Sequence, residues 1–341
     1  MARKSIRTAG WILFMIAACI VCITGCKPKQ IPEPPTGSYL ESIYSNANPN
    51  PDVEMFNNAM PPYLQYLDGL ILSNKDELLL YRASGAYYGY SYCFAEDTDR
   101  KEASDNYLKA RDYAMSELKR YRSFNQVMSY DSNLQSYKQA LKYNFDKRNL
   151  PALYWTAMNW TAWINLNLDK ADAIADIPKV EAMLEFITNI DGSYNGGSVY
   201  AALGSLHANR SKEDGGDPER AKEEFENAFT YSGNSYLTFN VMYAQFYATQ
   251  VKDKDLFQKT LASVMETPSN TYADKTFVNE IAKRKAKLLL DNIDNYFKPP
   301  KEKTEDMTEK KTEEKAEEKK PEEKTEEIKP EAAEPAPQPQ Q

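Results

Sequence analysis

The sequence predicts an all-α protein built from stacked helical hairpins, and three observations favour this fold class. Apolar residues recur at helical spacing from about Pro61 to Phe297, and alternating or β-branched runs are few there. Breaking residues divide this region into pairs of helices. In two of the pairs, a small residue, a large aromatic residue and a second small residue follow one another at the same intervals: Ala103, Tyr107 and Ala110, and again Ala221, Phe225 and Ala228.

This spacing is typical of tetratricopeptide repeats, in which small residues on one helix admit a bulky residue of the neighbouring helix. Each hairpin buries its apolar face by stacking on the next, so we expect an α-solenoid of about four hairpins. An entry helix near 61–72 and a C-terminal capping helix over 277–297 complete the predicted stack. The hairpins pair 81–94 with 103–110, 154–166 with a helix beginning at Pro178, 199–208 with 221–228, and 241–250 with 255–265. Pro178 is assigned to a first helical turn because proline is favoured there.

The first 25 residues have the features of a signal peptide. Three basic residues precede an apolar run over 11–23, which is shorter than the roughly 20 residues of a permanent membrane span. The run ends in Ile23-Thr24-Gly25-Cys26, which resembles the bacterial lipobox. The resemblance implies cleavage before Cys26 and lipidation of that residue; an ordinary secretory signal with an incidental cysteine is the alternative.

The remaining composition divides the chain into three parts. A proline-rich tether over 26–58 precedes the helical domain, which we assign to 59–298. The segment 299–341 holds nine lysines and fourteen acidic residues and no aromatic residue, so we expect it to be disordered. It is either a solvated extension or a docking strip for a basic partner. Because it carries most of the net charge of −8, the body is near neutral, and we expect no nucleic-acid binding.

The sequence favours a non-enzymatic protein without a cofactor. It contains one histidine, His207, which we expect to be a packed or partly exposed helix residue, and it has no phosphate-loop or dinucleotide motif. Cys93, surrounded by aromatic residues, is predicted to be a small buried hydrophobe. Residues 191–196 begin like a calcium-binding EF-hand loop, but the twelfth position is Ala202, where a glutamate would complete the oxygen shell. We therefore expect a turn between two helices and no metal site.

Several motifs follow one another in a fixed order along the body. They are Tyr154-Trp155; Ile177-Pro178-Lys179-Val180-Glu181; Asp191, Tyr194 and Gly197; Leu203-Gly204; Gly215-Gly216-Asp217 ahead of Ala221; Tyr243-Ala244 with Tyr247-Ala248; and Asp253, Asp255 and Phe257. This order resembles the TatT family, the tetratricopeptide-repeat periplasmic lipoproteins associated with TRAP transporters. The resemblance extends from about Tyr63 to Met265 and includes neither the tether nor the charged tail.

The resemblance implies a transporter accessory protein in the bacterial cell envelope, anchored by lipid and facing the periplasm. It implies a homotrimer that binds the TRAP substrate-binding subunit, with a channel in each protomer for a small apolar or organic-acid ligand. Two other functions stay open. One is a scaffold lipoprotein for envelope or outer-membrane protein assembly, and the other is a lipid-anchored carbohydrate-binding protein.

An aromatic helix face is the candidate ligand site. Four residues, Trp155, Asn159, Trp160 and Trp163, fall within about 140° of arc on a helix. We expect this face to line a cavity together with tyrosines of neighbouring first helices, namely Tyr87, Tyr88 and Tyr200. The alternative is that the face is ordinary core between hairpins.

Overall fold

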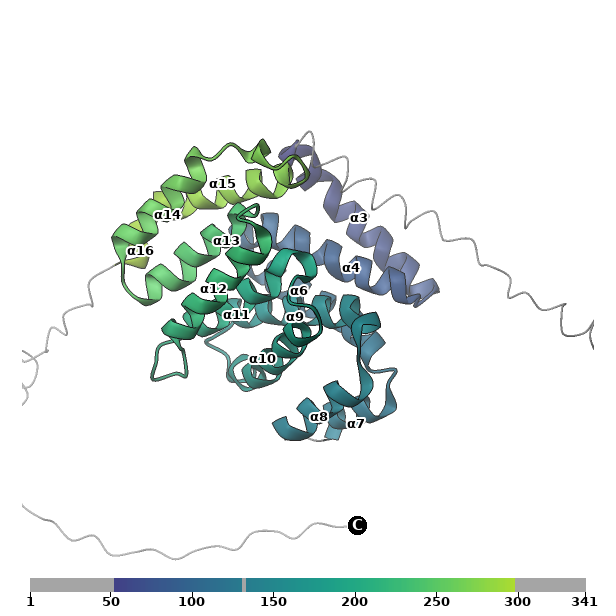
Figure 1. Cartoon of the computed structure of the whole chain (residues 1–341). Helices are drawn as coiled ribbons and strands as arrows, with labels where there is room; N and C mark the ends of the chain where they lie inside the picture. The colour runs from purple at the N-terminus through teal and green to yellow at the C-terminus, as the bar shows by residue number, and fades with distance from the viewer. Residues whose placement is uncertain (1–51, 131–132, 298–341) are drawn as a thin grey trace, which may run out of the picture. The chain divides into compact units, whose positions relative to one another are not determined.

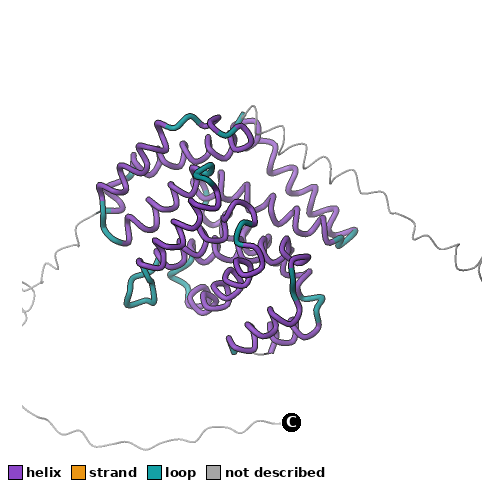
Figure 2. Tube along the Cα trace, in the orientation of Figure 1, coloured by secondary structure: helices purple, strands orange, loops and turns teal. Residues whose placement is uncertain are grey.

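The computed structural model describes residues 52–130 and 133–297, and within these ranges it contains helices, turns and no strand (Figure 2). The predicted all-α class is confirmed. Cys26, the tether up to Pro51 and the charged tail lie outside the described residues. Among the helices described, none combines the length and apolar character that crossing a membrane would require.

The first part of the chain forms α3 (Val53–Ser73), α4 (Glu77–Tyr90) and α6 (Arg100–Leu118). A π-helical turn, η1 (Ser91–Ala95), and the short α5 (Glu96–Thr98) continue α4 toward the loop. A small hairpin follows, made of α7 (Arg122–Tyr130) and α8 (Leu134–Asn144). The 3-10 turn η2 (Lys147–Asn149) then leads into the next hairpin.

That hairpin pairs α9 (Leu150–Leu166) with α10 (Ala171–Asp191), and the 3-10 turn η3 (Tyr194–Gly197) connects it to α11 (Ser198–Ala208) and α12 (Pro218–Ser232). The last hairpin consists of α13 (Leu237–Met242), its π-helical continuation η4 (Tyr243–Ala248), and α14 (Lys254–Glu266). Two 3-10 turns, η5 (Ser269–Thr271) and η6 (Ala273–Lys275), precede α15 (Thr276–Asp291) and α16 (Ile293–Tyr296).

Aspartates set the start of the second helix in three of the hairpins. Asp99, Asp217 and Asp253 each accept a hydrogen bond from a backbone N–H in the first turn of α6, α12 and α14. Such a cap satisfies a helix N–H that has no partner within the helix. An aspartate N-cap thus ends the loop of each of these hairpins and determines where its second helix begins.

The small and large residues that predicted the hairpins occupy the core. Tyr107, Phe225 and their flanking alanines are completely buried. A Cβ atom added to Gly204 of α11 would lie 2.8 Å from the ring of Phe225, so glycine is what allows α12 to approach this closely. The packing of a bulky residue against a small one, predicted from the spacing, is confirmed here.

The C-terminal helix packs against the N-terminal one. Figure 1 shows α15 beside the start of α3, and the rings of Phe56 and Phe277 lie with centroids 4.6 Å apart. Lys285 of α15 is buried and bonds Glu96 at 3.1 Å and Asp97 at 3.0 Å. The predicted capping helix is thus also a wall that joins the two ends of the hairpin series.

Three details of the predicted architecture were wrong. Pro178 lies inside α10, not in its first turn, because α10 begins seven residues earlier to bury Ala173 and Ile177 along with Val180. The carbonyl of Ile174 loses its helical partner there, and the side chain of Ile174 is exposed. The entry helix is also longer than expected. It begins at Val53, after Asp52 caps it, and continues through Pro61 and Pro62.

The third difference is an additional hairpin, α7 with α8, which the sequence analysis did not identify. Its helices are short and mostly polar, and only a few side chains, such as Phe124, Tyr137 and Leu141, are buried. A further small departure is at the C-terminus, where the predicted helix over 277–297 is interrupted at Asn292.

Candidate ligand-binding cavity

The first helices of the hairpins surround a cavity of about 700 Å³. Its walls come from α4 with η1, from α9, from η3 with α11, from α13, and from α15. On α4 and α9 the lining residues recur every three or four positions, as the inner face of a helix requires. The second helices α6, α10, α12 and α14 contribute no lining residue. The solenoid therefore places its first helices, together with α15, along one partly open cavity.

Aromatic rings dominate the wall made by α4 and α9. Tyr88 lies between Tyr92, with ring centroids 6.2 Å apart, and Trp155, at 5.8 Å. Trp155 in turn meets Tyr154 edge to face at 4.9 Å. Gly85 allows this arrangement, since a Cβ atom at that position would lie 2.7 Å from the indole of Trp155. The indole consequently rests on the backbone of α4.

The loop that begins like an EF-hand forms another part of the wall. Asn195, Gly196 and Gly197 all have positive φ, so the chain turns sharply between α10 and α11. The predicted turn is confirmed. Asp191 accepts hydrogen bonds from Ser193 and pairs with Lys147 at 3.1 Å. The turn brings Tyr194, Asn195 and Ser198 to the cavity, where the Ser198 hydroxyl lies 2.9 Å from that of Tyr154.

The hydroxyls of Tyr154 and Tyr88 and the thiol of Cys93 are neutral at ordinary pH. Burial, with a smaller contribution from neighbouring tyrosines, raises the pKa of Tyr154 to about 12, although Ser198 opposes the shift. Burial raises the pKa of Tyr88 well above its usual range and that of the Cys93 thiol to about 12. Cys93 is the small buried residue that the sequence predicted, and it also borders the cavity. Among the described lining residues, Arg82 is the one basic side chain and no carboxylate is present.

The structure brings two of the seven sequence-predicted ligand contacts to this cavity, Trp155 and Tyr88. The other five lie elsewhere. Asn159 is buried one turn beyond Trp155, where its amide donates to Ser84 Oγ of α4 at 3.1 Å. Trp163, two turns beyond, is enclosed in the core. Asn159 and Trp163 lie on the same side of α9 as Trp155. Neighbouring helices cover that side of α9 at these two residues, so neither borders the cavity.

The remaining three residues point into other surroundings. Trp160 lies about 140° around α9 from Trp155, and its Nε1 donates to Asp176 of α10 at 2.9 Å. The hydroxyl of Tyr87 donates to Asp68 of α3 at 2.8 Å, on the side of α4 that faces away from the cavity. Tyr200 stacks on Tyr231 of α12 with ring centroids 5.1 Å apart. An aromatic arc on one helix does not distinguish cavity from core, because both environments select the same residue types.

Sequence reasoning missed Arg82, Asn195, Ser198 and the contribution of α13. One available signal was the pair Gly85 and Gly89 in an aromatic run, four residues apart on one helix face, where glycine permits close approach. Another was the turn predicted over 191–196, because a turn between two hairpins can carry its polar residues into the space between them. The lining residues of α13 and α15 carry no such signal, because they reach the cavity only through the tertiary fold.

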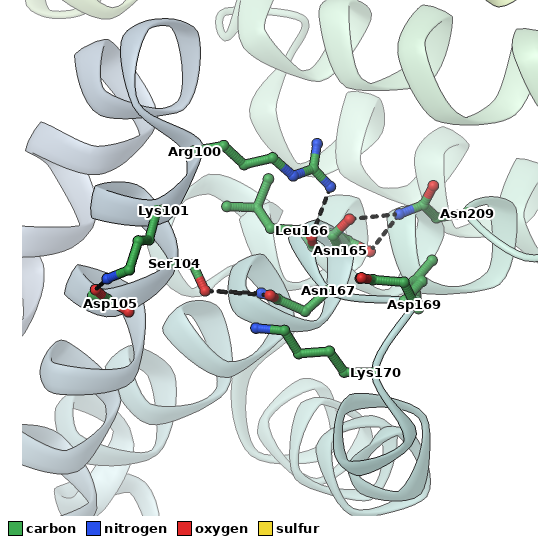
Figure 3. A pocket seen from close by; sticks show the side chains of 11 residues that line it. Arg100, Lys101, Ser104, Asp105, Asn165, Leu166, Asn167, Asp169, Lys170 and Asn209 are labelled. Carbon is green, nitrogen blue, oxygen red and sulfur yellow. Dashed lines mark hydrogen bonds and ion pairs between the residues drawn. The ribbon is translucent and has the colours of Figure 1, made fainter.

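A second hollow, of about 740 Å³, lies between the start of α6, the end of α9 and Asn209 after α11 (Figure 3). Several of its polar groups bond one another. Arg100 Nη2 donates to the Leu166 carbonyl at 2.6 Å, Asn167 donates to Ser104 Oγ at 3.0 Å, and Asn209 donates to the Asn165 side-chain oxygen at 3.2 Å. These bonds connect the hairpins, and they leave the apolar cavity as the better candidate for a ligand site.

The architecture defines a helical-hairpin protein in which the first helices line an aromatic cavity. The family model of the TRAP transporter T-component, TAtT, matches residues 49–297, and the chain belongs to this family. The resemblance drawn from the ordered motifs is therefore confirmed, and the protein is a component of a TRAP transport system with an accessory role. No curated protein matches the chain.

Proposed function

We propose that this T-component is a lipid-anchored accessory protein that faces the periplasm and binds the substrate-binding subunit of its TRAP system. In this proposal, the cavity holds or passes a small apolar or organic-acid ligand. The observation that carries it is the cavity of about 700 Å³ lined by the first helices of a chain that belongs to the T-component family.

The size and chemistry of the cavity support a ligand site. Small-molecule sites in proteins have volumes of roughly 300–1,000 Å³ and are mostly apolar with a few polar groups. Here the apolar surface comes from rings such as Tyr88, Trp155 and Phe239, and the polar groups are few: the Tyr154–Ser198 pair, Asn195 and Arg82. We place the ligand against Trp155 and Tyr88, and not against the five predicted contacts that lie away from the cavity.

The anchor and the oligomer are separate parts of the proposal. Lipidation of Cys26 would tether the body to a membrane, and exchange of this residue in Cys26→Ser should release the protein into the soluble periplasmic fraction. The trimer implied by the family resemblance predicts a molar mass three times that of the chain in light scattering. A monomer at micromolar concentration would remove the trimer from the proposal.

Binding to the substrate-binding subunit is the decisive test. We expect the full tagged chain to retain that subunit during co-purification, with a dissociation constant in the micromolar range or tighter. A second, unrelated periplasmic binding protein serves as the control. Failure to retain the cognate subunit at micromolar concentration would overturn the accessory-subunit proposal.

Ligand retention tests the cavity independently of the partner. Trp155→Leu and Trp160→Leu each remove one indole from α9, but only the first residue borders the cavity. Native mass spectrometry should show lost retention of small molecules in Trp155→Leu and normal retention in Trp160→Leu, with helical circular dichroism intact in both. Equal retention in the two variants would count against this cavity as the site.

A further inference from the structure

Arg82 is a cation without a partner in the wall of the cavity. It lies on α4 among the lining residues, and its Nη1 atom is buried without a hydrogen bond. Within residues 52–130 and 133–297, no carboxylate lies within ion-pair distance of its guanidinium. No carboxylate lines the cavity there either.

Three other cations, one buried and two half-buried like Arg82, are paired with carboxylates. Lys285, behind the cavity wall, bonds both Glu96 and Asp97, and Arg284 bonds Asp97 at 2.8 Å. Arg210, between α10 and α12, bonds Glu181 at 2.8 Å. Arg82 has no such carboxylate partner among the described residues, although it lies in the wall of the cavity.

The guanidinium of Arg82 therefore lacks a compensating negative charge within the described residues. A charged side chain enclosed by apolar groups is costly unless an opposite charge and hydrogen bonds compensate it. A guanidinium remains charged in proteins and presents parallel N–H donors that match the two oxygens of a carboxylate. A carboxylate on a ligand in the cavity would meet this requirement.

The rest of the wall limits the ligand to one negative charge. The other lining residues are aromatic, aliphatic or neutral polar, and no second basic side chain is among them. The faces of aromatic rings carry negative electrostatic potential, so a second carboxylate held against Tyr88 or Trp155 would be desolvated without compensation. An apolar body suits these rings.

We propose that the cavity binds an amphipathic monocarboxylate, with the carboxylate on Arg82 and the apolar body against Tyr88 and Trp155. This inference rests on the cavity being the ligand site of the proposed function, and it adds the chemical class of the ligand and the residue that selects it.

The test compares three molecules of eight carbons: octanoate, the neutral octanamide and the dicarboxylate octanedioate. Equilibrium dialysis measures their binding to the full chain in lipid nanodiscs, with empty nanodiscs as the reference. We expect octanoate to bind roughly tenfold or more tightly than either of the other two, because a charge-assisted hydrogen-bonded pair forms only with the monocarboxylate head beside an apolar tail.

Two variants assign the preference to the guanidinium. Arg82→Gln should bring octanoate and octanamide within about twofold of each other, whereas Arg82→Lys should keep the preference for octanoate. Arg122→Gln, which removes an exposed arginine of α7, is the matched control and should behave like the unaltered protein. Circular dichroism of each variant establishes that the helices are intact.

Three results would overturn the inference: octanamide or octanedioate binding as tightly as octanoate, a preference that survives in Arg82→Gln, or no binding of any of the three at millimolar concentration. None of these three results affects the retention of the substrate-binding subunit, because that retention is measured without octanoate, octanamide or octanedioate. The proposed accessory function and the proposed ligand class therefore fail on different measurements.

Discussion

The indole of Trp155 rests on Gly85, where a Cβ atom would approach Cζ2 to 2.7 Å and Cε2 to 2.9 Å. This relationship joins α4 to α9 at the centre of the aromatic wall. The position of the Trp155 ring, which borders the cavity, therefore depends on the absence of a side chain at residue 85.

Gly85→Ala should displace Trp155 and destabilise the protein. Overpacking a well-filled contact costs about 1–3 kcal/mol, which exceeds the gain in helix propensity from alanine. Chemical denaturation measures the loss, and a changed tryptophan emission reports the displaced ring. Gly69→Ala is the matched control, because nothing lies within 4 Å of its added Cβ in α3. That variant should be stabilised by about 0.5–1 kcal/mol; equal effects of the two substitutions would contradict the packing account.

Lys285→Met should destabilise the protein strongly. The change leaves Glu96 and Asp97 without the buried cation that joins α15 to α5, and breaking such a pair costs about 3–5 kcal/mol. Denaturant midpoints measure the effect. Lys287→Met, which removes only an exposed pair with Asp291, should change stability by about 0.5 kcal/mol or less. A loss for Lys285→Met as small as this would show that the buried pair contributes little.

The same lysine predicts a loss of stability at alkaline pH. Burial alone would lower its pKa, but Glu96 and Asp97 outweigh burial and raise the pKa of Lys285 above the ordinary value of 10.5. Its contribution is therefore fully present below pH 10.5 and is lost as the pH rises through the higher folded-state value. Unfolding curves between pH 9 and 12 should show a steeper decline for the unaltered protein than for Lys285→Met, which lacks this titrating amine.

His207 predicts a loss of stability on mild acidification. Burial, with Arg220 and Arg210 nearby, lowers its pKa to about 4, although Asp217 and Glu185 oppose the shift. The unfolded chain then binds a proton below about pH 6.5 that the folded chain accepts only near pH 4. Stability should fall between these values by up to about 3 kcal/mol. His207→Gln should flatten the profile in this window, and a slope identical in both proteins would exclude the histidine as its source.

Arg82→Met should stabilise the protein when the cavity is empty. The substitution removes a partly buried charge that has no partner within the described residues, and replacing such a group by a similar apolar side chain is worth about 1 kcal/mol or more. Thermal unfolding of ligand-free protein measures the change, with exposed Arg122→Met as the control. A decrease in stability would mean that Arg82 is a structural residue.

The sequence predicted the fold class because packing within a hairpin is local. Ala221, Phe225 and Ala228 follow one another on one helix, and their complete burial repeats the spacing that defined them. Pro178 shows the limit of local rules, since burial of Ala173 and Ile177 extends α10 upstream of a residue that usually begins a helix. The helices α7 and α8 have too few apolar residues to form a clear periodic pattern.

The cavity was only partly predictable because its wall is assembled from several hairpins. Trp155 and Trp163 look equivalent along α9, and their different surroundings depend on which helices cover each turn. Asn195 reaches the cavity through a left-handed turn, a geometry compatible with either a loop or a metal site when only the residue types are known. The spacing of residues within one helix carries no information about the distance between helices.

The bond from Lys285 to Glu96 spans 189 residues of sequence, and Val278 and Ile281 of the same helix close one side of the cavity. During synthesis, the hairpins up to α14 can therefore pack on one another while this side is still open to solvent. The cavity has its full lining only once the final helix has emerged and docked against segments made near the beginning. A chain that stops before α15 has the hairpins but lacks this side of the cavity.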